Sequence, residues 1–555
     1  MTAIQTTLLE KPETNNHTAK SYTGIYSMHK YWSKKPSNII RDFILKYSKI
    51  NEIVVDPFCG SGISITESIF TKRKAIGIDI NPSAIFITRQ MLTKVSSKEL
   101  ASAFKIIESK CRDEINKNYL VVRDGKSYIG THYYWKNGTL SEVWFNKGKT
   151  KIVEKPLDKD LELSNSFKVE NIPYYYPKRN LFHNSRINAN REQHVYDLFT
   201  PRNLTSLSWL LNEISNIPDE KIRDVLKFNF TSSMGQASKM VFAVTRRGKN
   251  NGKERATERK EVGSWVIGYW IPKENFEINA WNCFENRFKR ILKAKKEQEG
   301  NGYLLTEAKS FNELETENNL LLLTESAISG LKKIPDNSVD YVITDPPHGN
   351  RIPYLELSMM WNEWLGNPVN YEDEIIVSES KDRKKNLDNY NMLLKEALKQ
   401  IERVLKPNKY FSFMFNSIDD DTWIDLVNLL NSFSFDLEKV ETLGYSANSV
   451  VQDNREGGLK TDFIFTFKKN TSRIHNKIEL LTLDKNKDFI YQKIDECINN
   501  SKNGLEIYEI LNYLVTELLK KSKFFKLSEV LDIIKSDYTK LGNKWQRKEI
   551  NNDSK

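Results

Sequence analysis

A glycine-rich turn between a short apolar strand and a helix constrains the fold of this chain more than any other feature. Residues 51–56 have the β-branched character of a buried strand, Gly60 and Gly62 interrupt it, and residues 63–70 continue with helical spacing. Residues 74–79 then form a second apolar run that ends in a carboxylate. This order predicts a strand–helix–strand unit within an open parallel sheet.

The same segment carries groups suited to a nucleotide-like ligand. In an open parallel sheet, ligands bind beyond the carboxyl ends of the strands, and glycines in the first turn let the backbone approach them closely. Gly60 and Gly62 meet that requirement. Asp79, at the end of the second strand, can accept hydrogen bonds from a ribose diol. We therefore expect a nucleotide-like cofactor at this edge of the sheet.

The alternation of strands and helices stops after the first unit and resumes late in the chain. Residues 93–312 are rich in aromatic and mixed short segments, which is typical of an inserted domain. Asn81 and Pro82 open the last helix before this insertion. Beyond it we expect strands at 319–324, 339–344, 410–415, near Val440 and at 461–467, helices at 328–334, 389–405 and 423–430, and a turn at 406–408.

A rigid acceptor motif follows the strand at 339–344. The prolines of Asp345-Pro346-Pro347 fix the backbone and remove two amide donors, which leaves carbonyl oxygens that need partners. If Asp345 and the carbonyl of Pro346 accept both N–H bonds of a nucleobase amine, its nitrogen becomes tetrahedral and can attack an electrophilic methyl group. Such a base must first be flipped out of a duplex and stacked on a flat side chain, and His348 follows at the place where that side chain is needed. Alone, the motif is also compatible with a plain turn.

Length and composition indicate a multidomain globular protein. The chain has 555 residues, 39% hydrophobic and 28% charged, and no apolar run long enough to cross a membrane. We expect a cytoplasmic protein with no membrane contact, and the scattered cysteines predict neither a metal site nor disulfides. The expected divisions are a cofactor-binding half at 20–92, an insertion at 93–312, a catalytic half at 313–470 and a C-terminal helical region at 471–555.

Basic residues gather in one loop. Lysine and arginine number 84 against 73 aspartates and glutamates, which gives a net charge of +11 and a mild bias towards polyanions. Residues 246–260 form a glycine-punctuated basic stretch that can follow phosphates or lie idle in solvent. Its candidate DNA contacts are Arg246, Arg247, Lys249 and Lys253.

Several other side chains within and beside the insertion leave two interpretations open. Arg202, Asn203 and the run 230–239 offer groups that read base edges, but such groups also cap helices and form turns. The aromatic triplet 174–176 is more typical of a strand or core than of a stacking platform. Trp32 and His29 before the turn, and Tyr354, Glu356, Trp361 and Trp364 after the acceptor motif, can line a pocket or pack a core.

Together the two motifs resemble the S-adenosylmethionine-dependent amino-methyltransferases of DNA. That family combines a Phe-x-Gly-x-Gly cofactor motif with an Asp-Pro-Pro-Tyr-type catalytic motif, and this chain has Phe58-Cys-Gly60-Ser-Gly62 and Asp345-Pro-Pro-His348. The resemblance implies a Rossmann-like methyltransferase sheet, S-adenosylmethionine as cofactor, double-stranded DNA as substrate and a target-recognition domain in the insertion. It implies catalytic roles for Asp345, Pro346, Pro347 and His348, and cofactor contacts from Lys35, Pro36, Asp56, Phe58, Gly60, Gly62, Asp79 and Glu325.

The chain departs from the family pattern at His348, where Tyr, Phe or Trp is usual. Imidazole is flat but smaller, and it can be protonated. We expect methyl transfer to adenine N6 at a specific DNA site, in bacterial modification or phage defence and with restriction or defence proteins as possible partners. The alternatives are a cytosine-N4 enzyme, an RNA base methyltransferase and a DNA-binding subunit with reduced catalysis.

Overall fold

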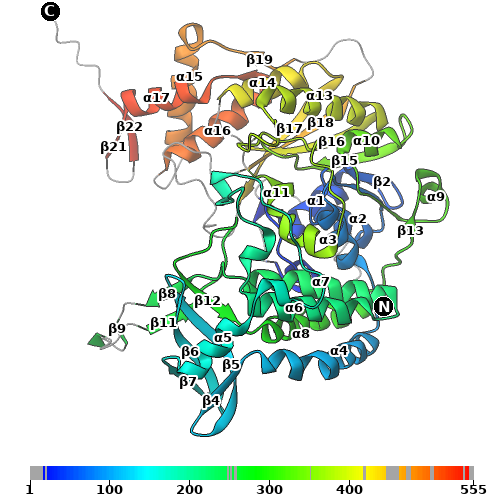
Figure 1. Cartoon of the computed structure of the whole chain (residues 1–555). Coiled ribbons are helices and arrows are strands. Elements are labelled where there is room, and N and C mark those ends of the chain that lie inside the picture. The colour runs from blue at the N-terminus through cyan, green and yellow to red at the C-terminus, as the bar shows by residue number, and fades with distance from the viewer. Residues whose placement is uncertain are drawn as a thin grey trace, which may run out of the picture.

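The computed structural model is built around one nine-stranded mixed sheet (Figure 1). It describes residues 17–18, 22–246, 249–250, 253–254, 259–349, 352–416, 420–444, 462–470, 477–500, 505–541 and 544–548. The strand order is β1-β17-β18-β16-β15-β2-β3-β14-β13. These strands are β1 (His17–Thr18), β2 (Ile53–Asp56), β3 (Lys74–Ile78), β13 (Glu307–Ala308), β14 (Leu320–Leu323), β15 (Val339–Thr344), β16 (Leu405–Phe415), β17 (Phe435–Gly444) and β18 (Asp462–Lys469).

The centre of the sheet is parallel, and the order in which the chain adds strands reverses beside β2. From β2 the chain moves outward to β3 and β14 on one side, and then returns to lay β15 against the other side of β2. β16 continues parallel to β15, whereas β18 is antiparallel to both β16 and β17. Loops at the carboxyl ends of β2 and β15 diverge at such a switch point, which is where open sheets bind ligands.

Alternating side chains of the central strands bury the two faces of the sheet in different cores. Val54, Tyr341 and Ile343 pack with the apolar face of α1 (Ser37–Tyr47). Val55 and Val342 point the other way, into a core shared with α10 (Ala327–Lys332), α13 (Leu387–Val404) and α14 (Asp420–Leu430). α2 (Ile63–Phe70) and α3 (Pro82–Leu92) pack beside β3 and β14. Because both faces are covered, the strands read as continuous apolar runs.

The inserted segment forms a second layered body that is fused to the first. Its antiparallel sheet has the order β12-β5-β6-β7, and β4 also pairs with β5. The core of this body extends without interruption to Met28, Trp32, Ile87 and Trp361, which lie outside the inserted segment. Its elements are α4 (Ser97–Lys117), β4 (Leu120–Arg123), β5 (Lys126–Lys136), β6 (Thr139–Lys147), β7 (Thr150–Glu154), α5 (Asp158–Ser166), α6 (Pro201–Ser215), α7 (Glu220–Ala237), β12 (Glu274–Ile278) and α8 (Ala280–Glu299).

A hairpin leaves this body between α7 and β12. β8 (Ala243–Arg246) pairs with β11 (Arg259–Val262), and beyond them β9 (Lys249–Asn250) pairs with β10 (Lys253–Glu254). Figure 1 shows the hairpin at the edge of the molecule, away from the nine-stranded sheet.

The C-terminal region is mainly helical and packs on the sheet. α15 (Leu483–Asn500), α16 (Ile507–Lys520) and α17 (Leu527–Asp537) share a core with β16, β17 and β18. Trp423 stacks on Phe524 with ring centroids 5.4 Å apart. Two short strand pairs, β19 (Glu479–Leu480) with β20 (Lys523–Phe524) and β21 (Tyr538–Leu541) with β22 (Lys544–Arg547), accompany the helices. None of the helices in the described part of the chain is long and apolar enough to span a membrane.

One predicted element is wrong. Residues 406–408 were expected to form a turn before the strand at 410–415, but β16 already begins at Leu405, which pairs with Val339. The turn residues are accommodated as an irregularity between the pairs at Val339 and Tyr341, where Asn408 has a φ of 61°. A bulge can absorb turn-forming residues without ending a strand.

Candidate active site

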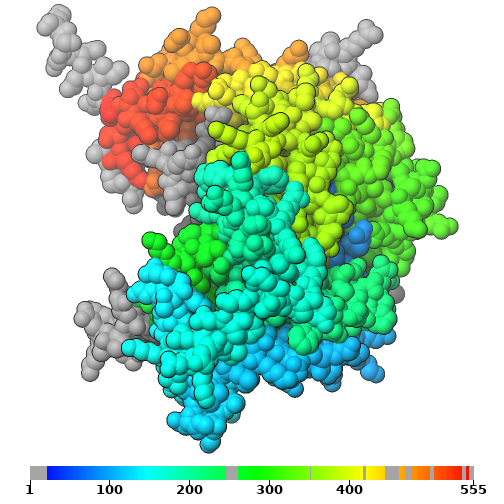
Figure 2. Space-filling model, viewed as in Figure 1, coloured from blue at the N-terminus to red at the C-terminus, as the bar shows by residue number. Residues whose placement is uncertain are grey.

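A cleft opens at the carboxyl ends of the parallel strands, at the switch point between β2 and β15. Its empty volume, including the part open to solvent, is about 890 Å³. It is lined by the loop after β2, the end of β3, Asp345 and Pro347 after β15, Met414 of β16 and the segment 31–35. On the face that Figure 2 shows, little of the N-terminal segment that carries the glycine turn is visible.

The glycine turn has the backbone conformation that its sequence predicts. Gly60 has a φ of 51° and Gly62 a φ of 73°, both in the left-handed region that favours glycine. A Cβ on Gly62 would lie 2.3 Å from Cγ2 of Thr88 in α3, so any other residue there collides with the next helix. Gly62 is also the residue that precedes α2. Both glycines are therefore required by the turn itself.

Two carboxylates brace the turn and face the cleft. Asp79 accepts hydrogen bonds from the backbone nitrogens of Gly60, at 2.8 Å, and Asn81, at 2.9 Å. Asp56 accepts from the backbone nitrogen of Phe58 at 3.0 Å and from the hydroxyls of Ser64 and Thr344. Burial raises the pKa of Asp79 to about 7 and that of Asp56 to about 6. Asp79 has fewer partners than Asp56, so it is the better placed to bind a ligand.

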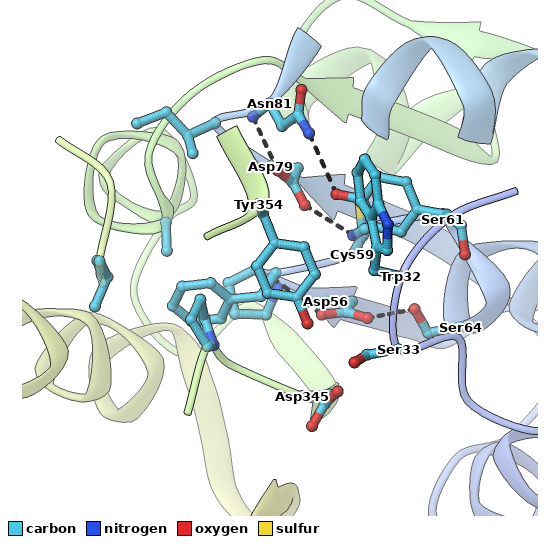
Figure 3. A pocket seen from close by; sticks show the side chains of 18 of the residues that line it. Trp32, Ser33, Asp56, Cys59, Ser61, Ser64, Asp79, Asn81, Asp345 and Tyr354 are labelled. Atoms are coloured by element: carbon cyan, nitrogen blue, oxygen red, sulfur yellow. Dashed lines mark hydrogen bonds between the residues drawn. The ribbon is translucent and has the colours of Figure 1, made fainter. Parts of the chain in front are cut away.

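The acceptor motif enters the same cleft from the other side of the switch point. Asp345 and Pro347 both line it, and the hydroxyl of Tyr390 fixes the carbonyl of Pro347 with a hydrogen bond of 2.7 Å. Oδ2 of Asp345 lies 3.0 Å from Nζ of Lys35, whereas Oδ1 is buried and accepts no hydrogen bond from the described residues. Figure 3 shows Asp79 and Asp345 on opposite sides of the ring of Tyr354.

His348 takes a position different from that of a stacking platform. Its side chain is 8% exposed and does not belong to the lining of the cleft. Nε2 lies 3.3 Å from the carbonyl oxygen of Met414 and 3.1 Å from Oδ1 of Asp345, and the ring packs 5.1 Å from that of Phe415. Nε2 thus faces two oxygen atoms of the protein, and the ring is engaged by Asp345 and β16 rather than by the cleft.

Aromatic side chains that the motifs do not include line the cleft instead. Tyr354, in α11 (Tyr354–Leu357), lies nearly parallel to Tyr31, with an interplanar angle of 17° and centroids 6.1 Å apart. Trp32 lines the cleft and stacks on Trp361 at 4.7 Å. Trp361 and Trp364, in α12 (Met359–Leu365), are buried core residues. Tyr31 was missed because a single aromatic next to a basic segment carries no periodic signal.

Only some of the remaining predicted cofactor residues line the cleft. Phe58 and Lys35 line the cleft, but Nζ of Lys35 contacts carboxylates there. Pro36 precedes α1 as its capping residue and is outside the lining. Glu325 is also outside it, because its carboxylate pairs with Lys333; the following residues Ser326 and Ala327 line the cleft instead.

Glu374, which the sequence did not single out, contributes a buried carboxylate to the wall of the cleft. It accepts a hydrogen bond of 3.1 Å from the backbone nitrogen of Leu355.

Residues of the insertion that could have read base edges are structural. Arg202 is 2% exposed and forms a bidentate pair with Glu277, at 2.8 and 2.7 Å. Asn203 is fully buried and donates to the carbonyls of Ala237 and Ile278. Most of the run 230–239 lies buried within α7. A polar side chain in the core serves the fold, since a buried donor without a partner is costly.

The aromatic triplet 174–176 lies outside any strand. Tyr174 and Tyr175 are exposed, Tyr175 by 53%, in an irregular segment, so the expectation of a strand or core is wrong for them. Prolines on both sides of the triplet prevent a paired strand.

In the basic loop, Arg247 lies outside the described residues, and for Arg246, Lys249 and Lys253 the structure describes the backbone of the hairpin alone.

Two comparisons of sequence found similar proteins. Residues 5–90, which contain the glycine turn and Asp79, match a family of DNA methylases of the N6/N4 type. The chain is thus similar to the DNA amino-methyltransferases over the segment that carries the glycine turn. It is 23% identical over 240 residues to the type II methyltransferase M.MjaII of Methanocaldococcus jannaschii, and this match spans 39% of each protein.

A solved structure was also found. It is assigned as a class I S-adenosylmethionine-dependent methyltransferase from Listeria monocytogenes, with 14% identity over 34% of this chain and 52% of that one. The TM-score of 0.16 is too low to support a conclusion about the fold, which rests here on the order and direction of the strands.

Proposed function

We propose that this protein is a site-specific DNA methyltransferase that transfers a methyl group from S-adenosylmethionine to N6 of a flipped-out adenine. One observation carries the proposal. The glycine turn with Asp79 and the acceptor motif with Asp345, which are remote in the sequence, open into a single cleft at the switch point of the sheet. A cofactor site beside an amine-binding acceptor is what methyl transfer to a base amine needs.

The residues of the first half fit a nucleoside cofactor. Gly60 lines the cleft without a side chain, and Asp79 presents a carboxylate held by two backbone donors. Asp79 would hold the ribose hydroxyls, the 58–62 turn would approach the methionine part, and Ser326 and Ala327 would border the adenine. Bound S-adenosylmethionine supplies an electrophilic methyl group.

The residues of the second half prepare the amine. Asp345 and the carbonyl of Pro346 would each accept one N–H, which localises the lone pair on nitrogen and aims it into the cleft. Tyr390 supports this arrangement, since its bond to Pro347 fixes the path of the backbone. After transfer the nitrogen loses one proton, for which Asp345 is the nearest acceptor in the cleft. Holding both reactants in one cleft supplies much of the acceleration.

Tyr354 is the side chain that we propose as the stacking surface for the flipped base. It lies between Asp79 and Asp345 in Figure 3. His348, by contrast, is not among the residues that line the cleft. The short helix α11, which contains Tyr354 and Glu356, is held in place because Arg383 pairs with both Glu356 and Glu374. Stacking on an aromatic ring contributes about 1–3 kcal/mol per base.

The choice of DNA rests on the resemblance and on the family match, and the choice of adenine rests on the resemblance alone. Cytosine N4 presents a similar amine, and an RNA base methyltransferase would need a similar cleft. The name of the M. jannaschii relative supports a role in modification beside a restriction enzyme. The insertion and its basic hairpin are the proposed DNA-binding part.

Transfer of labelled methyl from S-adenosylmethionine to genomic DNA and to total RNA, with identification of the modified nucleoside by mass, tests the proposal. We expect N6-methyladenine in DNA. N4-methylcytosine would change the base, and label in RNA alone would change the substrate. Cofactor binding without transfer to either would favour the binding-subunit alternative.

A further inference from the structure

Lys35 joins two carboxylates, of which Asp462 is buried and Asp345 belongs to the acceptor motif. Its Nζ lies 2.6 Å from Oδ2 of Asp462 and 3.0 Å from Oδ2 of Asp345. The side chains of Lys35 and Asp462 are 10% and 7% exposed, so these contacts are largely shielded from water. The resemblance had implied a cofactor contact for Lys35, whereas its ammonium is directed to the acceptor motif.

We infer that Lys35, held by Asp462, keeps Asp345 ionised and oriented for the amine, so that Lys35 is a positioning residue of the reaction. The inference rests on the proposed function, because it gives Asp345 the role of amine acceptor. It deepens that function by assigning a group of three charged side chains, Lys35 with Asp345 and Asp462, to the catalytic half.

The charges explain why a cation is needed. Asp345 and Asp462 share one ammonium, and Asp56 lies near enough for the charge of Asp345 to oppose the ionisation of Asp56. Nε2 of His348 lies 3.1 Å from Oδ1 of Asp345. Without Lys35, two carboxylates would face each other in a poorly hydrated site, and such pairs retain a proton. A proton on Asp345 turns an acceptor into a donor, which then competes with the amine.

The distances explain why a second carboxylate is needed. Lys35 is closer to Asp462 than to Asp345, so its strongest contact is outside the acceptor motif. It occupies Oδ2 of Asp345 and leaves Oδ1 without a hydrogen bond from the described residues. With Asp462 removed, the ammonium would bind Asp345 alone and reduce its strength as an acceptor.

The fold fixes both partners of Asp345. Lys35 precedes Pro36, the capping residue of α1, and α1 is anchored in the core through Ile40. Asp462 is the first residue of β18 and pairs with Leu443 of β17. The ammonium and the second carboxylate are thus delivered from rigid elements.

The test compares Lys35→Met, Lys35→Arg, Asp462→Asn and the Lys35→Met/Asp462→Asn double variant in the full chain. For each we would measure S-adenosylmethionine affinity, thermal unfolding and the single-turnover rate of methyl transfer from pH 6 to 9. Lys409→Met is the matched control, because Lys409 is also shared by two carboxylates, Glu52 at 2.5 Å and Asp340 at 3.4 Å, outside the cleft.

We expect Lys35→Met to bind the cofactor normally. Its rate at pH 7 should fall about tenfold or more, which is the effect of a rise of about one unit in the pKa of the carboxylate pair. The rate should recover as the pH rises, because the shared proton then leaves. The double variant should recover part of the rate at pH 7, Lys35→Arg should retain most of it, and Lys409→Met should match the wild type.

Other outcomes would overturn the inference. Loss of cofactor affinity with an unchanged saturated rate would make Lys35 a cofactor contact, and an unchanged pH profile would remove the charge argument. If Lys35→Met does not fold, Asp462→Asn decides, since an undiminished rate there contradicts the shared-cation arrangement. If the wild type methylates no nucleic acid, the proposed function fails and the inference fails with it. This outcome differs from failure of the inference alone, in which the wild type is active and the Lys35 or Asp462 variants do not behave as expected.

Discussion

The hydroxyl of Thr344 donates a hydrogen bond of 2.7 Å to Oδ1 of Asp56. Thr344 is the last residue of β15 and Asp56 the last of β2, so this bond joins the two motifs at the switch point of the sheet. It sets the glycine turn and the acceptor motif at a fixed separation. Both side chains are buried, which shields the bond from water.

Removing this hydroxyl should loosen the junction. Thr344→Val keeps the shape of the side chain but withdraws one of the donors to Asp56, and we expect a loss of about 1–3 kcal/mol in the free energy of unfolding. Urea denaturation measures it. Thr344→Ser retains the hydroxyl and is the control. Equal stability of the two variants would show that the bond does not hold the junction together.

Substituting the second glycine of the turn tests its steric requirement. Gly62→Ala combines a left-handed backbone with a collision against Thr88, whereas Gly138→Ala has a similar φ of 78° and open space around it. We expect about 1 kcal/mol of destabilisation for Gly138→Ala and about 2–4 kcal/mol for Gly62→Ala. Thermal unfolding of both variants gives the difference, and similar values for the two would rule out the collision as its cause.

Several elements of the fold and the site are predictable from local sequence. α2 occupies residues 63–70 and β15 residues 339–344 as expected, because a left-handed glycine starts one and the Asp-Pro-Pro motif ends the other. The location of Asp79 follows from the same pattern. These features depend on neighbours in the chain.

The features that could not be predicted depend on contacts between residues that are far apart in the sequence. Arg202 looks like a base-reading residue until Glu277 of β12 is placed beside it. The link from Lys35 to Asp345 likewise requires α1 to lie against the sheet. His348 could be identified as unusual, but its withdrawal towards Met414 depends on the position of β16. Such contacts need the tertiary structure.

Cofactor binding should depend on pH through Asp79. Burial raises the pKa of this carboxyl to about 7, so much of it is protonated just below neutrality. Ribose hydroxyls donate to the ionised form, and binding therefore releases a proton and strengthens as the pH rises from 6 to 8. Calorimetric titration with S-adenosylmethionine should show an increase approaching tenfold per pH unit at the acidic end. Asp79→Asn should bind weakly and without this dependence; a similar slope in that variant would assign the proton to another group.

Tyr354 and His348 should differ in their effect on the target base. Tyr354→Leu removes an aromatic face from the cleft, and we expect DNA with a flipped base to bind about 1–3 kcal/mol more weakly. Tyr354→Phe keeps that face and should bind normally. 2-Aminopurine at the target position reports stacking through its fluorescence. His348→Leu should leave this signal unchanged, and a change there as large as in Tyr354→Leu would return the stacking role to His348.

The central claim is that Asp345 accepts the amine beside an intact cofactor site. The most direct test measures single-turnover methyl transfer to DNA by the wild type and by Asp345→Asn, with S-adenosylmethionine affinity determined on the same preparations. The account predicts that Asp345→Asn binds the cofactor as the wild type does and transfers methyl groups about 10²–10⁴ times more slowly. Transfer at the wild-type rate by Asp345→Asn would contradict it.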